Sequence, residues 1–578
     1  MSREIRFDAY RRKIIQAGIG ISILGLSGCT SKACVIKPPE AFTLAPVSNP
    51  FLSPDFPPID ERLSHYSIDV HVHLFNASDV NVKGFVEPIL ERDKLPPKLK
   101  KMAPILAKLI QKLADKTMTA DQEYDFLTSV DAQYGQKGKQ TARSVLDKRM
   151  AQIEQTQSQA IVDYIKGEGE EQLFLELYNE TMDPTGSKQA KESVLSPGLV
   201  LDIIKGRGSI EQKELALSEQ DTFPGMLRFV WQMLTPRWNT LLTYQKAFNG
   251  EDGNYRIDAI FSSLVDFDHW LEGCPKSSRL SQVKLHGYLS RLSGGYMLPL
   301  VSYNPWTDIK YENASFTLMQ MALEKYGFIG VKIYPANGFY PHDNVSNSST
   351  TEQSRPNLEA LDLRLEAFFN YCAKNDIPVM AHTAKSMGKD EAADEFGGPR
   401  GWVSLSDSYK GKDKKPIINA GHFGGAENWT IQMAGLMKKD SGLDFYGDLG
   451  YWSEFNDCNE KFCFAKVWIE KAITQSGGTA KQRIMYGSDW IMSIKTRQWK
   501  QFPTRVDKTI GDLIPSKDLF YQNALNCFSL NAGEKQWTKV IELFKNQPGG
   551  PPRWLIASAK SKQKSERRNT NILDLSRI

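Results

Sequence analysis

The chain has 578 residues, of which 41% are hydrophobic and 24% charged, and its formal net charge is +4 at pH 7. This composition is ordinary for a soluble globular protein, and the length allows one large core and an additional module. The small net charge excludes the strongly basic composition that is typical of nucleic-acid-binding proteins, so we expect no nucleic-acid partner.

Residues 1–28 have the features of an export signal. Basic residues, including Arg11 and Arg12, precede an apolar run from Ile14 to Leu26 that is too short for a membrane-spanning helix. The run ends in Leu26-Ser27-Gly28-Cys29, which resembles the lipobox of bacterial lipoproteins. The resemblance implies a lipid anchor on Cys29 and a place in the cell envelope. Because Thr30 stands where those lipoproteins carry an inner-membrane retention aspartate, it implies the outer membrane, facing the periplasm. A plain secretory signal or a short anchor helix is the alternative, and the arginine pair also loosely resembles a twin-arginine signal.

A proline-rich stretch leads into the first predicted strand. Residues 29–60 are rich in Pro, Ser and Ala, which predicts an extended tether. In the stretch Ser67–Asn76, Ile68, Val70 and Val72 alternate with Asp69, His71 and His73. Side chains alternate along a strand, so we expect the acidic and imidazole groups on one face, where both histidines can clamp one metal ion. Two exposed histidines near a turn are the plain alternative.

The next segment, residues 85–250, predicts a helical cap inserted after the first strand. Leu99, Met102, Leu106, Leu109 and Leu113 recur at spacings of three and four, which indicates an amphipathic helix. Residues 145–164 predict a second helix. The lysines along the first helix are best explained as a solvated face. A basic surface that binds anionic lipid or polymer is the alternative.

From about residue 255, short apolar runs alternate with helical patterns, such as those over 315–326 and 358–375. With the first strand, eight strands are predicted, and seven of them lie at 259–265, 296–302, 329–335, 377–382, 416–422, 443–449 and 483–490. Alternation of this kind predicts an α/β fold, a (β/α)8 TIM barrel over residues 61–84 and 251–535. Residues 536–578 predict a basic, solvated C-terminal tail.

Six polar residues follow or end these strands, where the chemistry of a TIM barrel is placed. They are His71, His73, Lys332, His382, His422 and Asp489, and they include half of the eight histidines in the chain. Imidazole and carboxylate are ligands for Zn²⁺ and similar divalent ions, with Mn or Fe as alternatives. Each residue alone is more often structural, but the full set predicts a metal site that activates water.

In this order the six residues resemble the amidohydrolase superfamily of metal-dependent hydrolases. The segments 330–335, 486–490 and 521–526 resemble its branch of aminocarboxymuconate-semialdehyde decarboxylase-like enzymes. The resemblance implies that His71, His73 and Asp489 bind a first ion, joined by His382, which could instead bind a second ion. It implies that His422 binds the second ion or polarises the substrate, and that Asp489 accepts a proton. Lys332 is either carboxylated between two ions, a cation for a substrate carboxylate, or a structural ion-pair partner.

The leading hypothesis is an envelope hydrolase that cleaves an amide, ester or lactone bond in a small-molecule substrate. A non-oxidative decarboxylase and a catalytically silent scaffold are the alternatives. The substrate is not specified by the sequence, and Tyr303, Trp306, Tyr334 and Trp490 are candidate wall residues only because they lie near strand ends.

Among the seven cysteines, Cys458 and Cys463 are the only close pair in the folded part of the chain. Their spacing fits either a local disulfide or two free thiols.

Overall fold

The computed structural model describes residues 39–56, 65–85, 95–183, 194–207, 210–214, 222–251, 255–268, 270–271, 273–347, 357–385, 391–459 and 461–566. The predicted signal segment, the lipidation site Cys29 and the last twelve residues of the predicted tail lie outside these ranges. Every helix within them is too short or too polar to cross a bilayer.

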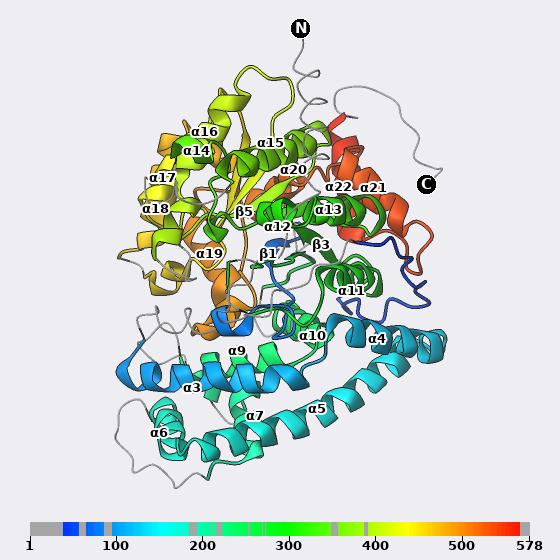
Figure 1. The fold of residues 1–578 in the computed structure, drawn as a ribbon, viewed down its shortest axis with the longest axis vertical. Helices are drawn as coiled ribbons and strands as arrows, with labels where there is room; N and C mark the ends of the chain where they lie inside the picture. Colours follow the sequence, from blue (N-terminus) through cyan, green and yellow to red (C-terminus); the bar gives the residue numbers. More distant parts are fainter. Residues whose placement is uncertain are drawn as a thin grey trace, which may run out of the picture. The chain divides into compact units, whose positions relative to one another are not determined.

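The described residues contain eight parallel strands, and each strand pairs with the next one along the chain (Figure 1). They are β1 (Ile68–Val72), β2 (Ala259–Ser263), β3 (Met297–Ser302), β4 (Gly330–Ile333), β5 (Val379–His382), β6 (Ile417–Gly421), β7 (Asp444–Asp448) and β8 (Ile484–Met485). The chain after β8 returns to β1, because Val72 bridges Trp490 and the Val70 amide donates to the Tyr486 carbonyl at 3.2 Å. The predicted (β/α)8 barrel is confirmed.

Helices surround the sheet, and strand residues alternate between them and the barrel interior. The helices are α11 (Arg279–Leu292), α12 (Pro305–Lys310), α13 (Ala314–Lys325), α14 (Asn344–Asn347), α15 (Leu358–Lys374), α16 (Pro399–Tyr409), α17 (Asn428–Gly435), α18 (Phe464–Gln475), α19 (Phe502–Ile510), α20 (Asn523–Cys527), α21 (Lys535–Phe544) and α22 (Arg553–Glu566). On β3, for example, Leu298 and Leu300 pack inside the barrel, whereas Met297 and Val301 belong to the layer beneath the helices.

The C-terminal helices close the N-terminal end of the barrel. Phe544, Trp554 and Leu555 are buried in the same cluster as Phe261 of β2, and the rings of Phe261 and Trp554 lie 6.2 Å apart. The structure therefore differs from the predicted solvated tail over residues 536–559. The basic side chains cluster toward the end of the chain, whereas the large apolar side chains before them, such as Phe544, Trp554 and Leu555, face the open end of the barrel and are buried there.

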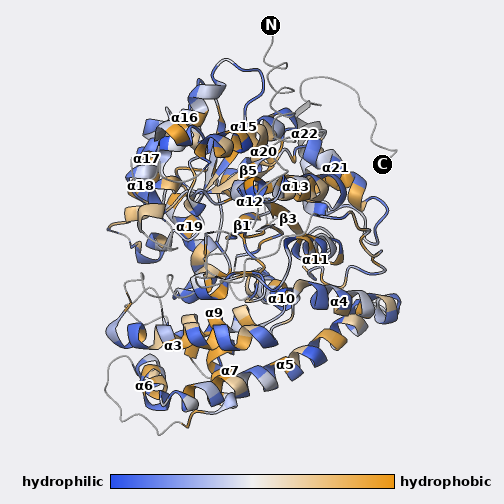
Figure 2. Cartoon of the chain, viewed as in Figure 1, coloured by the Kyte–Doolittle hydropathy of each residue, from blue (hydrophilic) through white to orange (hydrophobic). Residues whose placement is uncertain are grey.

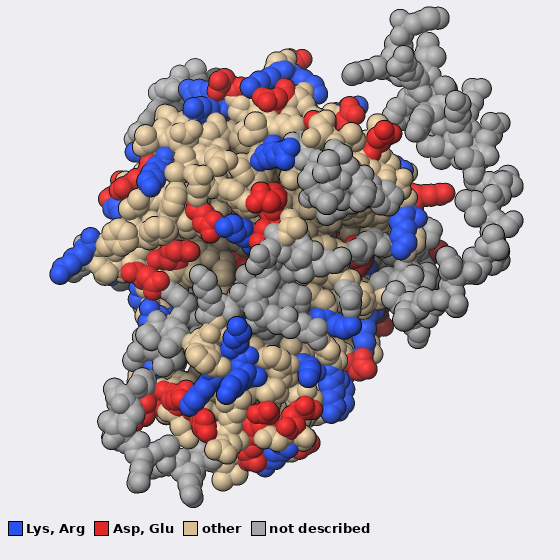
Figure 3. Space-filling view, turned by 60° about the vertical axis from the view of Figure 1, so that its left-hand side comes forward, with Lys and Arg blue, Asp and Glu red and all other residues tan. Residues whose placement is uncertain are grey.

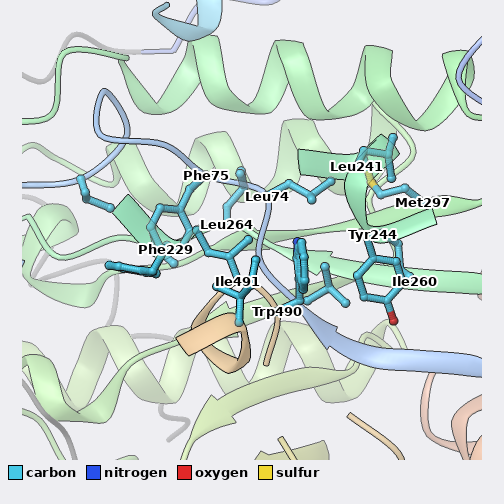
Figure 4. Packing of buried hydrophobic residues seen from close by; sticks show 14 of the residues in the cluster. Leu74, Phe75, Phe229, Leu241, Tyr244, Ile260, Leu264, Met297, Trp490 and Ile491 are labelled. Atoms are coloured by element: carbon cyan, nitrogen blue, oxygen red, sulfur yellow. The ribbon is translucent and has the colours of Figure 1, made fainter. Parts of the chain in front are cut away.

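The insertion after β1 is helical throughout its described part. Its helices are α3 (Pro97–Leu113), α4 (Ala120–Tyr134), α5 (Lys139–Gly167), α6 (Glu171–Met182), α7 (Pro197–Lys205), α8 (Ile210–Glu214), α9 (Phe223–Leu234) and α10 (Arg237–Ala247). All residues of α9 are buried, and Figure 2 shows this helix as largely apolar between α3 and the barrel. Figure 4 shows Phe229 of α9 in one cluster with Phe75 and Ile491, which follow β1 and β8.

A buried ion cluster joins the cap to the barrel. Arg237 of α10 donates to Asp79, which follows β1, at 2.8 Å and to Glu123 of α4 at 2.9 Å. All three side chains are almost completely buried, so each charge depends on its partners.

The proline-rich segment packs against the rest of the fold and does not extend into solvent. Leu44, Phe51 and Leu52 are buried, and the ring of Phe42 stacks on Tyr326 of the barrel at 4.0 Å. The structure therefore differs from the predicted tether over residues 39–56. Proline and serine prevent regular secondary structure there, but the apolar residues between them still gain from burial.

Cys458 and Cys463 form a disulfide, which resolves the alternatives left open by their spacing. Cys274 is also disulfide-bonded, whereas Cys372 and Cys527 are free and buried.

Candidate metal centre

The strand that carries His71 and His73 contains a β-bulge. Asp69 pairs with Ile260 of β2, but Val72 pairs with Ser262, so β1 has one extra residue between these two points. Bulges of this kind redirect side chains and are frequent beside active sites.

The bulge corrects one prediction about this strand. Ile68 and Val70 lie inside the barrel, and Asp69 faces the cap, where it accepts a 2.6 Å hydrogen bond from the Tyr244 hydroxyl of α10. Both histidines of the His-x-His motif point into the mouth of the barrel. Asp69 therefore does not share their face, because the extra residue interrupts the two-residue alternation.

His71, His73 and Asp489 form a compact group of metal-ligating side chains. Their ligand atoms all lie within 4.8 Å of one another, and all three residues are buried. The Nε2 atoms of His71 and His73 lie 3.5 and 3.4 Å from the same oxygen of Asp489, Oδ1. Two imidazole nitrogens and a carboxylate oxygen form a donor set that suits Zn²⁺ and similar divalent ions.

The opposite nitrogen of each imidazole is held by a hydrogen-bond acceptor. His71 Nδ1 donates to Asp448 Oδ1 at 2.9 Å, and His73 Nδ1 donates to the Ser263 carbonyl at 3.0 Å. With the proton on Nδ1, each ring presents the lone pair of Nε2 toward Asp489. Metal-binding histidines are oriented in this way, so the residues present fit a divalent cation.

Asp448 was not among the residues predicted from the sequence. It ends β7 and is fully buried, and besides His71 its Oδ1 accepts the amides of His422 and Gly450 at 3.2 and 3.0 Å. Its Oδ2 accepts a 2.8 Å hydrogen bond from the side chain of Asn419. Its position at the end of the seventh predicted strand is the one feature of the sequence that could have indicated a place in the site.

Glycines at three neighbouring strand ends make room for the His71 ring. A β-carbon at Gly450 would lie 2.6 Å from His71 Nδ1, and one at Gly487 would lie 2.8 Å from His71 Cβ. A β-carbon at Gly421 would lie 3.1 Å from His71 Cε1. These distances are shorter than normal contacts, so the close approach of the strands around His71 requires glycine.

Two site residues adopt left-handed backbone conformations. His422 has φ +67° and Asp489 has φ +56°, a region that side chains other than glycine enter at a cost of about 1–3 kcal/mol. The Asp489 amide donates to the His71 carbonyl at 2.8 Å, which fixes the aspartate beside its partner.

The environment keeps His71 and His382 neutral and Asp489 charged. Burial, aided by the nearby Lys332 ammonium, holds the pKa of His71 well below its usual value, and burial does the same for His382. Burial opposes ionisation of Asp489, but the adjacent imidazoles of His73, His71 and His422 lower its pKa to about 2. Neutral imidazole and ionised carboxylate are the forms that bind metal.

The other three predicted residues surround this group without belonging to it. His422 Nδ1 donates to the Gly450 carbonyl at 2.9 Å, and its Nε2 lies 3.0 Å from His382 Nδ1. His382 Nε2 is buried and has no hydrogen-bond partner among the described residues. Lys332 Nζ lies 3.3 Å from His71 Nε2, and burial lowers the pKa of this fully buried lysine to about 8.

Of the four candidate wall residues, the structure brings Tyr334 to the site. Its ring centre lies 6.0 Å from that of His382 and 5.2 Å from Lys332 Nζ. The Tyr303 ring stacks on Phe368 of α15, and the Trp306 indole donates to the Asn337 carbonyl. Trp490 packs against Tyr244 (Figure 4). These three side chains have structural contacts.

Comparison with known proteins yields fold neighbours alone. No family model matches the chain, and no curated protein matches it. An uncharacterized TIM-barrel protein from Bordetella bronchiseptica shares 12% identity over 58% of this chain and 90% of its own, with a TM-score of 0.35. A 2,6-dihydroxybenzoate decarboxylase from Rhizobium shares 12% over 51% of this chain and 90% of its own (TM-score 0.34). An amidohydrolase II protein shares 15% over 55% of this chain and 94% of its own (TM-score 0.33). The assignment of function therefore rests on the site itself.

Proposed function

We propose that the protein is a metal-dependent hydrolase of the amidohydrolase superfamily that cleaves an amide, ester or lactone bond. The observation that carries the proposal is the convergence of His71, His73 and Asp489 at the carboxyl ends of β1 and β8. The same residues, in the same order along the chain, carry the resemblance to that superfamily. Active sites of TIM barrels lie at this end of the strands.

His71, His73 and Asp489 would hold the ion, which we propose to be Zn²⁺, with Mn²⁺ or Fe²⁺ as alternatives. A divalent ion in such a site supplies Lewis acidity and lowers the pKa of water to about 7. Asp489 is ionised at neutral pH, because its pKa lies at about 2, and it is available to accept a proton from the attacking water.

The neighbouring residues have distinct roles in this proposal. His382 Nε2 is buried without a partner, so it can hydrogen-bond to the substrate. His422 is fixed by the Gly450 carbonyl and orients His382 through their 3.0 Å contact. We propose a single ion. In the alternative with two ions, Lys332 is carboxylated and His382 Nδ1 and His422 Nε2 become ligands of the second ion.

One observation favours a decarboxylase as the second candidate. Lys332 is buried beside His71, and a buried ammonium group is a suitable partner for the carboxylate of a substrate. A panel of amides, esters, lactones and aromatic carboxylic acids, incubated with metal-loaded protein, separates the two reactions. Hydrolysis products support the hydrolase, whereas release of CO₂ supports the decarboxylase.

A matched pair of variants tests whether the activity belongs to this site. His73→Ala removes a proposed ligand, whereas His342→Ala removes a histidine that hydrogen-bonds to Ser404 of α16 and is not among the proposed ligands. We expect His73→Ala to abolish turnover and His342→Ala to retain it. Equal activity of the two variants would contradict the proposal, and a scaffold function would then be favoured.

We also propose that the protein is exported and anchored in the cell envelope through a lipid on Cys29. The disulfide between Cys458 and Cys463 supports export, since disulfides persist in oxidising compartments. Mass spectrometry of the protein purified from membranes tests this proposal. A mature chain that begins at acylated Cys29 is expected, and an unprocessed chain would contradict it.

A further inference from the structure

A second concave site lies outside the metal centre, at the same end of the barrel. It is a surface cavity of about 720 Å³. Its walls come from residues 455–459 and 461–463 of the loop after β7, from Lys466 of α18, and from residues 501–509, which follow β8 and include most of α19. In TIM barrels the loops after the seventh and eighth strands frequently form a site for phosphate groups.

The walls of this cavity are basic. Lys461, Lys466, Arg505 and Lys508 line it, and none of the described lining residues is acidic. Lys466 pairs with Asp512 at 2.7 Å, but neither Lys461 nor Lys508 has a carboxylate partner within the described chain. Positive charge therefore exceeds negative charge among the described residues that line the cavity.

Arg505 shows the same imbalance from a half-buried position. Its guanidinium donates to the Asn456 carbonyl at 3.2 Å, a contact that does not neutralise its charge. Burial lowers the pKa of Arg505 and the neighbouring Arg497 lowers it further, and Asp457, which pairs with Arg497, offsets only part of this. An anion in the cavity would relieve this repulsion.

Two exposed aromatic side chains flank the basic walls. Phe462 is 60% exposed and Phe464 46% exposed, and they are the only aromatic residues among the exposed large hydrophobic side chains of the described chain. Their ring centres lie 6.5 Å apart. The Cys458–Cys463 disulfide closes the short loop that presents Phe462, so the aromatic ring stays beside the lysines without support from the core.

We propose that this cavity and its aromatic rim form a docking site for an anionic phospholipid membrane. A lipid phosphate enters the cavity between Lys461, Arg505 and Lys508, while Phe462 and Phe464 insert into the interface. Aromatic side chains next to basic ones are typical of interfacial membrane binding, because the rings gain apolar contact and the charges attract anionic headgroups.

The charge distribution favours a lipid surface over a nucleic acid. On the face that Figure 3 brings forward, which includes the side of α18, acidic and basic side chains are interspersed. A nucleic acid would require a broad basic stripe, whereas a lipid headgroup requires a local pocket. The docking site lies at the carboxyl ends of the strands, so it would bring the mouth of the barrel toward the membrane.

Vesicle co-sedimentation of the full chain tests the proposal. The protein carries Cys29→Ser, so that no acyl group is attached at that position. We expect binding to vesicles of equal parts phosphatidylcholine and phosphatidylglycerol, weakened by salt, and no comparable binding to phosphatidylcholine alone. Lys461→Gln with Lys508→Gln is expected to weaken binding about 25-fold, at about fivefold per charge. Phe462→Ser with Phe464→Ser is expected to weaken it about tenfold or more.

A matched control removes two exposed lysines elsewhere. Lys438→Gln with Lys439→Gln lies before β7, at the opposite end of the barrel, and is expected to change binding less than twofold. Unchanged binding in both test pairs, or an equal loss in the control pair, would overturn the proposal. Binding of inorganic phosphate in the cavity without binding to vesicles would also overturn it, since the site would then take a free phosphoryl anion. Near-ultraviolet circular dichroism confirms that each variant is folded.

Discussion

Asp448→Asn tests how the protein prepares His71 for a metal ion. The carboxylate accepts the Nδ1 proton of His71, so its negative charge raises the basicity of Nε2 on the far side of the ring. Asparagine keeps the size and shape of the side chain but removes the charge. Loss of such an outer partner typically weakens metal affinity 10–100-fold, which corresponds to about 1.4–2.8 kcal/mol of binding free energy.

The surroundings of Asp448 indicate that this substitution spares the fold. If the new amide oxygen keeps the three contacts of Oδ1, the new NH₂ group faces the Asn419 side chain in place of Oδ2. Asn419 Oδ1 has no hydrogen-bond partner among the described residues, so a rotation of this amide provides an acceptor. We therefore expect the free energy of unfolding of the metal-free variant to lie within about 1 kcal/mol of that of the metal-free parent protein.

Competition with a chromogenic chelator measures the dissociation constant for Zn²⁺, and thermal unfolding of the metal-free protein measures stability. Asp440→Asn, on an exposed turn before β7, is the matched control and should leave both quantities unchanged. Unchanged zinc affinity in Asp448→Asn would refute the argument. Loss of stability as large as the loss of affinity would also refute it, because Asp448 would then support the fold rather than the metal ligand.

Three further substitutions test other parts of the account. Gly487→Ala places a β-carbon 2.8 Å from His71 Cβ, so we expect about 1–3 kcal/mol of destabilisation in thermal unfolding. In the control Gly167→Ala the new β-carbon meets no atom within 4 Å, so this variant should lose no stability. Equal unfolding temperatures for the two alanine variants would be inconsistent with a crowded His71. Arg237→Met leaves two buried carboxylates without their cation and should cost about 3–5 kcal/mol in denaturant unfolding; a cost below about 1 kcal/mol would show that the cluster is not a lock between cap and barrel. Tyr244→Phe removes the hydroxyl that donates to Asp69 and should cost about 1–3 kcal/mol, and no change in stability would argue against that contact.

The barrel could be predicted because its strands are buried on both faces. Runs such as residues 296–302 are almost continuously apolar, and all eight predicted strands are present, although β8 is reduced to Ile484–Met485. Polar residues at the ends of such runs are conspicuous, which is how His382, His422 and Asp489 were found. The same reasoning could have found Asp448, but a carboxylate that ends a strand gives no sign of what it contacts.

Features that depend on packing between distant segments were not predictable. The bulge between Asp69 and Val72 leaves the alternating pattern of the sequence intact while it turns His71 away from Asp69. The contact of Asp69 with Tyr244 joins residues far apart in the chain. Burial of Leu44, Phe51, Leu52 and Trp554 is likewise decided by surfaces that other segments supply, because composition describes a segment and not its partner.

The central claim is that His71, His73 and Asp489 bind one divalent ion together. Anomalous diffraction at the zinc edge, from crystals grown with Zn²⁺, tests it most directly. We predict one strong peak within about 2.0–2.2 Å of His71 Nε2, His73 Nε2 and an oxygen of Asp489. A well-ordered barrel with no peak at these three residues, or with zinc bound by other side chains instead, would contradict the account.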